Sequence, residues 1–189
     1  MPCKRAAELF QYLAKPVWIL LLILLFVITI SVVFPAGKTL LGIPPELESL
    51  DTTLTYSPKQ AFELLETYTP AQRQAYALTH VTLDLLFPVV FTLTLGAVIT
   101  YFTNSVFQPN SRWRGLYLLP LALFCLDMLE NVLVISLALT HPNSPQILAA
   151  AAGAVTLVKW IAAGLTMTAV AVSGLLFVWQ LVQKRVTKG

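Results

Sequence analysis

Four apolar runs dominate the sequence, each close to or longer than the roughly 18 residues that a helix needs to cross a lipid bilayer. Hydrophobic residues make up 57% of the chain and charged residues only 11%, and a soluble domain cannot bury that much apolar surface. The runs therefore predict an all-α fold, a four-helix transmembrane bundle that forms a single integral membrane domain over residues 1–189. The expected spans are residues 17–34, 77–103, 116–140 and 147–182, and the expected outer loop is residues 35–76.

The first apolar run follows three basic residues, Lys4, Arg5 and Lys15, as the apolar part of a secretory signal peptide does. The run is longer than that of an ordinary signal peptide, and bulky Phe34 stands where a cleavage site needs a small residue. We therefore interpret the first run as an uncleaved membrane anchor.

Basic residues are distributed unevenly over the segments that flank the spans. The first and third loops contain only Lys38, Lys59 and Arg73. The two termini and the second loop contain Lys4, Arg5, Lys15, Arg112, Arg114, Lys184, Arg185 and Lys188. Because cytoplasmic segments are enriched in lysine and arginine, both termini are expected to be cytoplasmic and the first loop extracytoplasmic. This topology accounts for the basic residues, so the expected partner is the lipid bilayer and not nucleic acid.

The outer loop contains two helix-start signatures. In "SPKQ", Ser57 is the expected N-cap and Gln60 follows three residues later, and "TPAQ" repeats the pattern with Thr69 and Gln72. Both are capping boxes with proline at the first helical position, where proline is tolerated. They predict one helix at about 58–67 and a second that continues into the second span, so that a helical extracytoplasmic loop caps the bundle.

Charged residues interrupt the apolar runs at four positions. Asp84 lies in the second span, Asp127 and Glu130 lie in the third, and Lys159 lies in the fourth. Each charge near the centre of a membrane helix costs about 2.5–3.5 kcal/mol on insertion scales. A cost of that size implies pairing, and three carboxyls against one lysine imply that at least one carboxyl keeps its proton near neutral pH.

Helical spacing places these polar residues on common faces. His80 and Asp84 are four residues apart, Asp127 and Asn131 are four apart, and Glu130 is adjacent on the same side. The rise of an α-helix also gives the charged residues overlapping depths in the outer half of the membrane. These observations predict one buried cluster with the fourth-span lysine.

The cluster has several possible roles. A hydrogen-bonded network can fix helix register without any further function; alternatively, the cluster binds a ligand or handles protons. A metal site is not expected, because the lysine would compete with the ion and no second histidine is nearby, and no cofactor or catalytic residue is indicated. The candidate ligand-binding or proton-handling residues are His80, Asp84, Asp127, Glu130, Asn131 and Lys159.

Two segments, "YALTHVTLDLLFPVVFTLTLG" and "LPLALFCLDMLENVLV", carry a resemblance to a group of uncharacterised bacterial four-helix integral membrane proteins. That group has an aspartate before an aromatic-proline pair in the second helix, here Asp84 and Phe87-Pro88, and an Asp-x-x-Glu-Asn motif in the third, which "DMLEN" matches. The resemblance covers about residues 50–160. It implies the four-helix architecture, the polar positions and a bacterial inner membrane location, and it implies no activity.

The function that the sequence predicts is that of a small polytopic membrane protein with a buried polar pocket. The pocket would bind a small molecule or a lipid head group, or relay protons. One alternative is an accessory or assembly subunit of a larger membrane complex, whose polar cluster serves only the fold. A second alternative is an intramembrane lipid-modifying enzyme, which rests on analogy with the acid and base groups of sterol-type isomerases.

Overall fold

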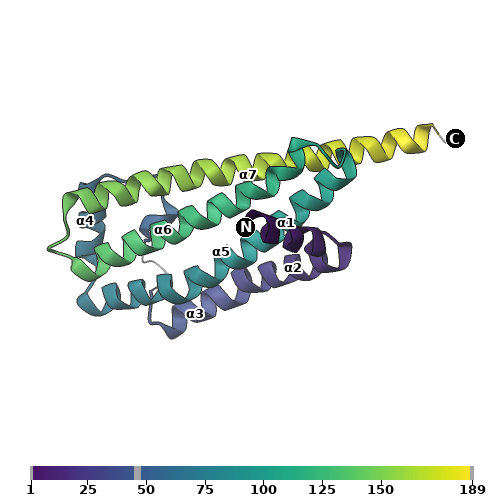
Figure 1. Cartoon of the computed structure of the whole chain (residues 1–189). Coiled ribbons are helices and arrows are strands. Elements are labelled where there is room, and N and C mark those ends of the chain that lie inside the picture. Colours follow the sequence, from purple (N-terminus) through teal and green to yellow (C-terminus); the bar gives the residue numbers. More distant parts are fainter. Residues whose placement is uncertain (1, 45–47, 188–189) are drawn as a thin grey trace. The chain divides into compact units, whose positions relative to one another are not determined.

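The computed structural model describes residues 2–44 and 48–187, and all regular secondary structure in these ranges is helical (Figure 1). The prediction of an all-α fold is therefore confirmed. The α-helices are α1 (Pro2–Leu13), α2 (Pro16–Ile28), α3 (Phe34–Leu40), α4 (Pro58–Thr67), α5 (Pro70–Val106), α6 (Leu118–Thr140) and α7 (Gln146–Val186). A π-helical segment, η1 (Thr29–Val33), joins α2 to α3, and short 3-10 segments are η2 (Leu50–Thr52) and η3 (Arg112–Tyr117).

Four helical stretches are long and apolar enough to cross a membrane, as the sequence predicts. They are Pro16–Leu40, Pro70–Val106, Arg112–Thr140 and Gln146–Val186. The first stretch continues through η1 and α3 to Leu40, past the expected end at residue 34. Pro35 lies two residues after the π-helical segment η1 and does not stop this helix.

The contacts within the chain divide it into two compact units. Unit 1 comprises Met1–Phe26, Val90–Leu123 and Ala162–Gly189, and unit 2 comprises Val27–Val89 and Phe124–Ile161. The divisions fall inside the continuous helices α2–α3, α5, α6 and α7, so each unit contains a segment of all four long helices.

In unit 1, the amphipathic helix α1 anchors itself through Phe10, which is 1% exposed. The Phe10 ring lies where a Cβ at Gly96 would collide with it, so the glycine allows the ring to contact α5 directly. The Phe10 ring also packs against Tyr117 at a centroid distance of 5.6 Å. Gln11 and Asn104 exchange side-chain hydrogen bonds of 2.7 and 3.3 Å. The sequence interpretation assigned no helix here.

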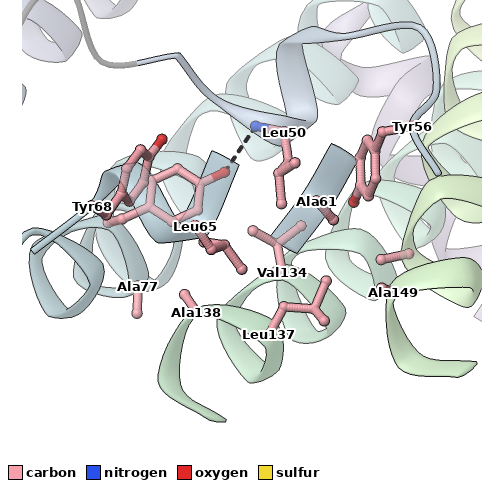
Figure 2. Packing of buried hydrophobic residues seen from close by; sticks show 12 residues of the cluster. Leu50, Tyr56, Ala61, Leu65, Tyr68, Ala77, Val134, Leu137, Ala138 and Ala149 are labelled. Atoms are coloured by element: carbon pink, nitrogen blue, oxygen red, sulfur yellow. Dashed lines mark hydrogen bonds between the residues drawn. The ribbon is translucent and has the colours of Figure 1, made fainter. Parts of the chain in front are cut away.

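In unit 2, α4 and the segment before it pack onto α5, α6 and α7 through one cluster of buried apolar residues (Figure 2). Ala61 and Leu65 of α4 have no exposed surface, and they meet Val134 and Leu137 of α6, which have none either. Small residues on the facing helices, such as Ala149, allow this close approach. The helical loop therefore belongs to the core of unit 2.

The two capping boxes predicted from sequence are confirmed. The Ser57 hydroxyl accepts a bond of 3.3 Å from the Gln60 backbone N–H, while the Gln60 side chain accepts one of 2.8 Å from the Ser57 N–H. At the start of α5, Thr69 and Gln72 form the same pair of bonds, at 3.2 and 2.8 Å. Each box satisfies N–H groups that a helix leaves unpaired at its start.

Candidate functional site

The centre of the polar cluster in unit 2 is an ion pair between Lys159 of α7 and Glu130 of α6. Glu130 is completely buried, and its second oxygen accepts a hydrogen bond of 2.6 Å from the Thr156 hydroxyl. The Lys159 ammonium also lies 3.4 Å from an Asp127 oxygen and 3.4 Å from the Asp51 backbone carbonyl. The buried carboxylate is therefore both charge-paired and hydrogen-bonded, as a charge in an apolar environment requires.

A second polar group forms around His80 of α5, which is 2% exposed. Its Nδ1 atom lies 2.7 Å from an Asp84 oxygen and 3.1 Å from the Asn131 side-chain oxygen. Both neighbours are acceptors, so Nδ1 carries the proton in this arrangement. Asn131 donates its amide N–H to the Asp84 backbone carbonyl at 3.0 Å, which fixes the orientation of the amide. This bond links α6 to α5.

Residues 49–56, which we call the strap, lie over this cluster and carry Asp51. The strap is held to α5 by the Tyr76 hydroxyl, which accepts from the Leu50 N–H at 3.1 Å (Figure 2). It is held to α7 by the Trp160 indole N–H, which donates to the Thr53 carbonyl at 2.7 Å. These bonds position a loop residue, Asp51, beside residues from three membrane helices.

The strap also depends on a close approach to Gly153 of α7. A Cβ at Gly153 would collide with the Tyr56 carbonyl oxygen, so no larger residue fits without a shift of the strap. The Thr55 hydroxyl donates to the Gly153 carbonyl at 3.1 Å on the same stretch. The absence of a side chain at Gly153 therefore allows the strap to contact α7.

Tyr56 and Tyr68 flank this region outside the spans. Burial raises the pKa of Tyr56 to about 12, the Thr156 hydroxyl acts to lower it, and the charges of Glu130 and Asp51 act to raise it. Burial likewise raises the pKa of Tyr68. Both side chains are neutral phenols at physiological pH, so neither is an acid that exchanges protons there.

A cleft of about 300 Å³ opens beside the ion pair, entirely within unit 2. Its polar floor is formed by Asp51, Asp84, Asp127, Glu130, Asn131 and Lys159. The remaining lining consists of Ile30, Phe34, Thr52, Phe87 and Trp160, which are mostly apolar. Ile30 belongs to the π-helical segment η1, and such segments often occur at functional sites.

A smaller chamber of about 70 Å³ adjoins the strap and the cleft. The cleft and the chamber share Phe34, Asp51, Thr52 and Asp84 in their linings. His80 also lines the chamber, and its buried Nε2 atom has no hydrogen-bond partner among the described residues. An Asp51 carboxylate oxygen lies 3.9 Å from this Nε2 atom. A volume of this size holds a few water molecules.

The structure brings together all six residues that the sequence singles out: His80, Asp84, Asp127, Glu130, Asn131 and Lys159. In the described parts of the chain, no three histidine, cysteine, aspartate or glutamate side chains converge in a geometry that could hold a metal ion. The acids instead contact a lysine, a histidine and hydroxyl groups.

Sequence reasoning missed Asp51, Thr156 and Trp160. Thr156 precedes Lys159 by three residues, a spacing that places both on one helix face. This spacing could have identified Thr156 from the sequence. Asp51 lies in a loop, and only the bonds from the strap to α5 and α7 place it at the site. No local sequence signal predicts that placement.

Comparisons of the chain with protein-family models, with curated proteins and with solved structures find no match.

Proposed function

We propose that this membrane protein binds a small amphipathic molecule, a lipid or a lipid-like compound, in the cleft beside the Lys159–Glu130 pair. The observation that carries the proposal is the composition of the cleft, which combines a charged floor with walls of Ile30, Phe34, Phe87 and Trp160. Binding sites for small molecules are concave, mostly apolar and equipped with a few well-placed polar groups. The cleft volume, about 300 Å³, suits a head group with a short part of its chain.

The arrangement of the floor supports this proposal over a purely structural cluster. A network that serves only the fold has its polar atoms closed off by protein partners, with no adjoining cavity. Here Asp84 and Asp127 retain 15% and 19% side-chain exposure while they line the cleft. Glu130, in contrast, is fully buried and serves to hold Lys159 in place.

Proton transfer is a second candidate function, and the geometry around His80 favours it. His80 lies between Asp84, at 2.7 Å from Nδ1, and Asp51, at 3.9 Å from Nε2. Histidine takes up and releases protons near neutral pH, and the chamber at its Nε2 has room for water. Protons would then pass between the chamber and the carboxylates that also line the cleft.

The remaining alternatives have less support. A subunit whose polar cluster serves only the fold has no need of a cleft. Native mass spectrometry in mild detergent tests this alternative, because it shows whether the protein is extracted from the membrane together with partner proteins. A lipid-modifying enzyme would use Asp84, Glu130 and His80 as its acid and base groups. Such an enzyme that used a hydroxyl nucleophile would have only Thr52 for this role among the described cleft residues. The Thr52 Oγ1 atom already donates to the Ser49 carbonyl at 2.8 Å.

The proposed location is a bacterial inner membrane with both termini cytoplasmic and the loop that carries α4 outside. The distribution of lysine and arginine supports this topology. Glu63→Cys, at an exposed position of α4, in a protein whose Cys3 and Cys125 are replaced by alanine, should react with a membrane-impermeant reagent from the periplasmic side. If the cysteine reacts only after the reagent reaches the cytoplasm, the proposed orientation is wrong. The ligand proposal does not depend on the orientation and is tested separately.

The ligand proposal is tested by filling the cleft. Ile30→Trp places a large side chain on the cleft wall, whereas Val132→Trp adds the same bulk to an exposed position of α6 outside the lining. Each protein is purified from native membranes in mild detergent, and the small molecules that it carries are identified by mass spectrometry. We expect one class of amphipathic molecule with the parent protein and with Val132→Trp, and its loss with Ile30→Trp. An identical set of molecules in all three would contradict the proposal.

A further inference from the structure

We infer that the head group taken up by the cleft is a hydrogen-bond-donating cation, such as the primary ammonium of an aminated lipid or an alkylamine. This inference rests on the proposed function, because it names the chemical class of the molecule that the same cleft would bind. The inference follows from a comparison of the hydrogen-bond donors of the floor, which mostly have protein partners, with its acceptors, several of which do not.

Among the side-chain donors at the floor, every donor except the second N–H of the Asn131 amide has a protein acceptor. The Lys159 ammonium faces three acceptors, Glu130 Oε2, Asp127 Oδ1 and the Asp51 carbonyl. The Thr156 hydroxyl lies 2.6 Å from Glu130, and the Asn131 amide donates to the Asp84 carbonyl. An ammonium group has only three N–H bonds, so Lys159 has none left for an anionic ligand.

The acceptors of the floor are left over. Asp51, Asp84 and Asp127 each use one carboxylate oxygen for their contacts with donors or cations, and their second oxygens have no donor among the described residues. In the adjoining chamber, neutral His80 offers a further acceptor, because its proton is on Nδ1 and its buried Nε2 has no hydrogen-bond partner among the described residues. Carboxylate oxygens that line a cleft without a protein donor favour a ligand that donates hydrogen bonds.

The balance of acidic and basic groups at the cleft also favours a cationic ligand. The cleft lining contains four carboxyl groups and one ammonium group, and His80 behind Asp84 is the second base in contact with them. Even with His80 protonated, two bases face four acids. A bound cation would offset this excess of acids. An anionic head group would instead add to the negative charge.

The walls suit a cation that carries an apolar chain. The rings of Phe34 and Phe87 meet edge to face at 5.8 Å, and the Trp160 ring is held by its bond to the Thr53 carbonyl. Aromatic faces attract cations and also accept apolar contact. An alkylammonium would place its charge near Asp127 and its chain against these rings.

The test uses the full-length protein in nanodiscs of phosphatidylcholine, a lipid whose head group has no primary amine. Three probes share one diazirine-bearing alkyl chain and end in a primary amine, a hydroxyl or a carboxylate. After illumination, adducts are mapped by mass spectrometry to peptides that contain Phe34, Phe87 or Trp160. Excess non-photoreactive alkylamine serves as competitor, so that only saturable labelling is counted.

We expect the amine probe to label these peptides about ten-fold or more above the alcohol at equal membrane concentration, because hydrogen bonds to charged groups are the stronger kind. Asp127→Asn should reduce amine labelling to the level of the alcohol. Glu63→Gln, which removes an exposed carboxylate of α4, should leave the preference unchanged. Asp51→Asn, which lies outside the spans, replaces Asp127→Asn if that variant does not fold.

The outcomes separate the two proposals. Saturable labelling of the cleft peptides by the alcohol or the acid at least as strongly as by the amine overturns the cationic head group and leaves the cleft as a binding site. No saturable labelling of the cleft peptides by any probe overturns the binding function itself. Preferential amine labelling that persists in both Asp127→Asn and Asp51→Asn overturns the role assigned to the floor carboxylates.

Discussion

The Lys159 ammonium of α7 is ion-paired with the carboxylate of Glu130 of α6, and Glu130 has no exposed surface. This pair joins two of the long helices inside unit 2 and forms part of the polar floor of the cleft. Since removal of one partner leaves the other as an uncompensated buried charge, the pair has to be kept or removed as a whole.

The first prediction concerns this pair. Glu130→Gln should lower the free energy of unfolding by about 3 kcal/mol, at the lower end of the effect of breaking a buried pair, because Asp127 remains 3.4 Å from Lys159. In a double-mutant cycle with Lys159→Gln, the coupling energy should exceed about 1 kcal/mol. The exposed pair Lys59–Glu63, at 3.7 Å, is the matched control and should show no measurable coupling. Equal coupling energies in the two pairs would show that burial does not make the Lys159–Glu130 pair stronger than an exposed pair.

The second prediction concerns the contact between the strap and α7. Gly153→Ala should destabilise the protein, because the added Cβ collides with the Tyr56 carbonyl oxygen. Gly164→Ala on the same helix meets nothing within 4 Å and should stabilise it by up to about 1 kcal/mol through helix propensity. Thermal unfolding of both variants in one detergent compares them directly. Stabilisation by Gly153→Ala would mean that the strap does not approach α7 as described.

The third prediction concerns the capping box of α4. Ser57→Ala should cost about 1 kcal/mol, because the Gln60 N–H loses the hydroxyl that accepts its bond. Ser57→Asp keeps an acceptor at the N-cap and should retain most of the stability. Hydrogen exchange of the first-turn amides of α4 reports the difference, with faster exchange expected only for the alanine variant. Unchanged exchange in Ser57→Ala would show that packing of Ala61 and Leu65 alone holds the helix start.

The fourth prediction concerns the bond between Trp160 and the strap. Trp160→Phe keeps an aromatic ring on the cleft wall but removes the indole N–H that donates to the Thr53 carbonyl. Amide exchange of residues 49–56 should therefore accelerate, while exchange in α4 stays unchanged. Trp179→Phe, at a position of α7 that is 62% exposed, is the control and should leave the strap unaffected. Equal exchange of the strap in all three proteins would contradict the described attachment.

Local signals were sufficient to predict the four long apolar helices, helix α4 and part of the site. The capping boxes at Ser57 and Thr69 depend on residues three positions apart, so the sequence alone identifies them. The pairing of Asp84 with His80 likewise follows from a four-residue spacing on one helix. The spans could be found because an apolar run of about 18 residues or more is typical of a helix that crosses a bilayer.

Other features depend on contacts between distant parts of the chain. Asp51 reaches the site only because the strap is bonded to Tyr76 and Trp160, which are far from it in sequence. Asn131 shares its face with Asp127 by spacing, yet its amide bonds to His80 and to the Asp84 carbonyl, because those groups on α5 are its neighbours in space. Helix α1 was missed because its apolar face is short and is defined mainly by Phe10, whose contact at Gly96 is a tertiary one.

The most decisive measurement for an accessible, acid-lined cleft is modification of its carboxyls by a hydrophobic carbodiimide. Such a reagent adds to a protonated carboxyl group that it can reach from the membrane, and mass spectrometry locates the stable acylurea. We expect modification of Asp127 or Asp84, which line the cleft and face an excess of acids, and none of the fully buried Glu130. We also expect protection by Ile30→Trp and no protection by Val132→Trp. If Asp84 and Asp127 remain unmodified in the parent protein, or if Ile30→Trp gives no protection, the cluster does not line an accessible cleft and the proposed binding site is contradicted.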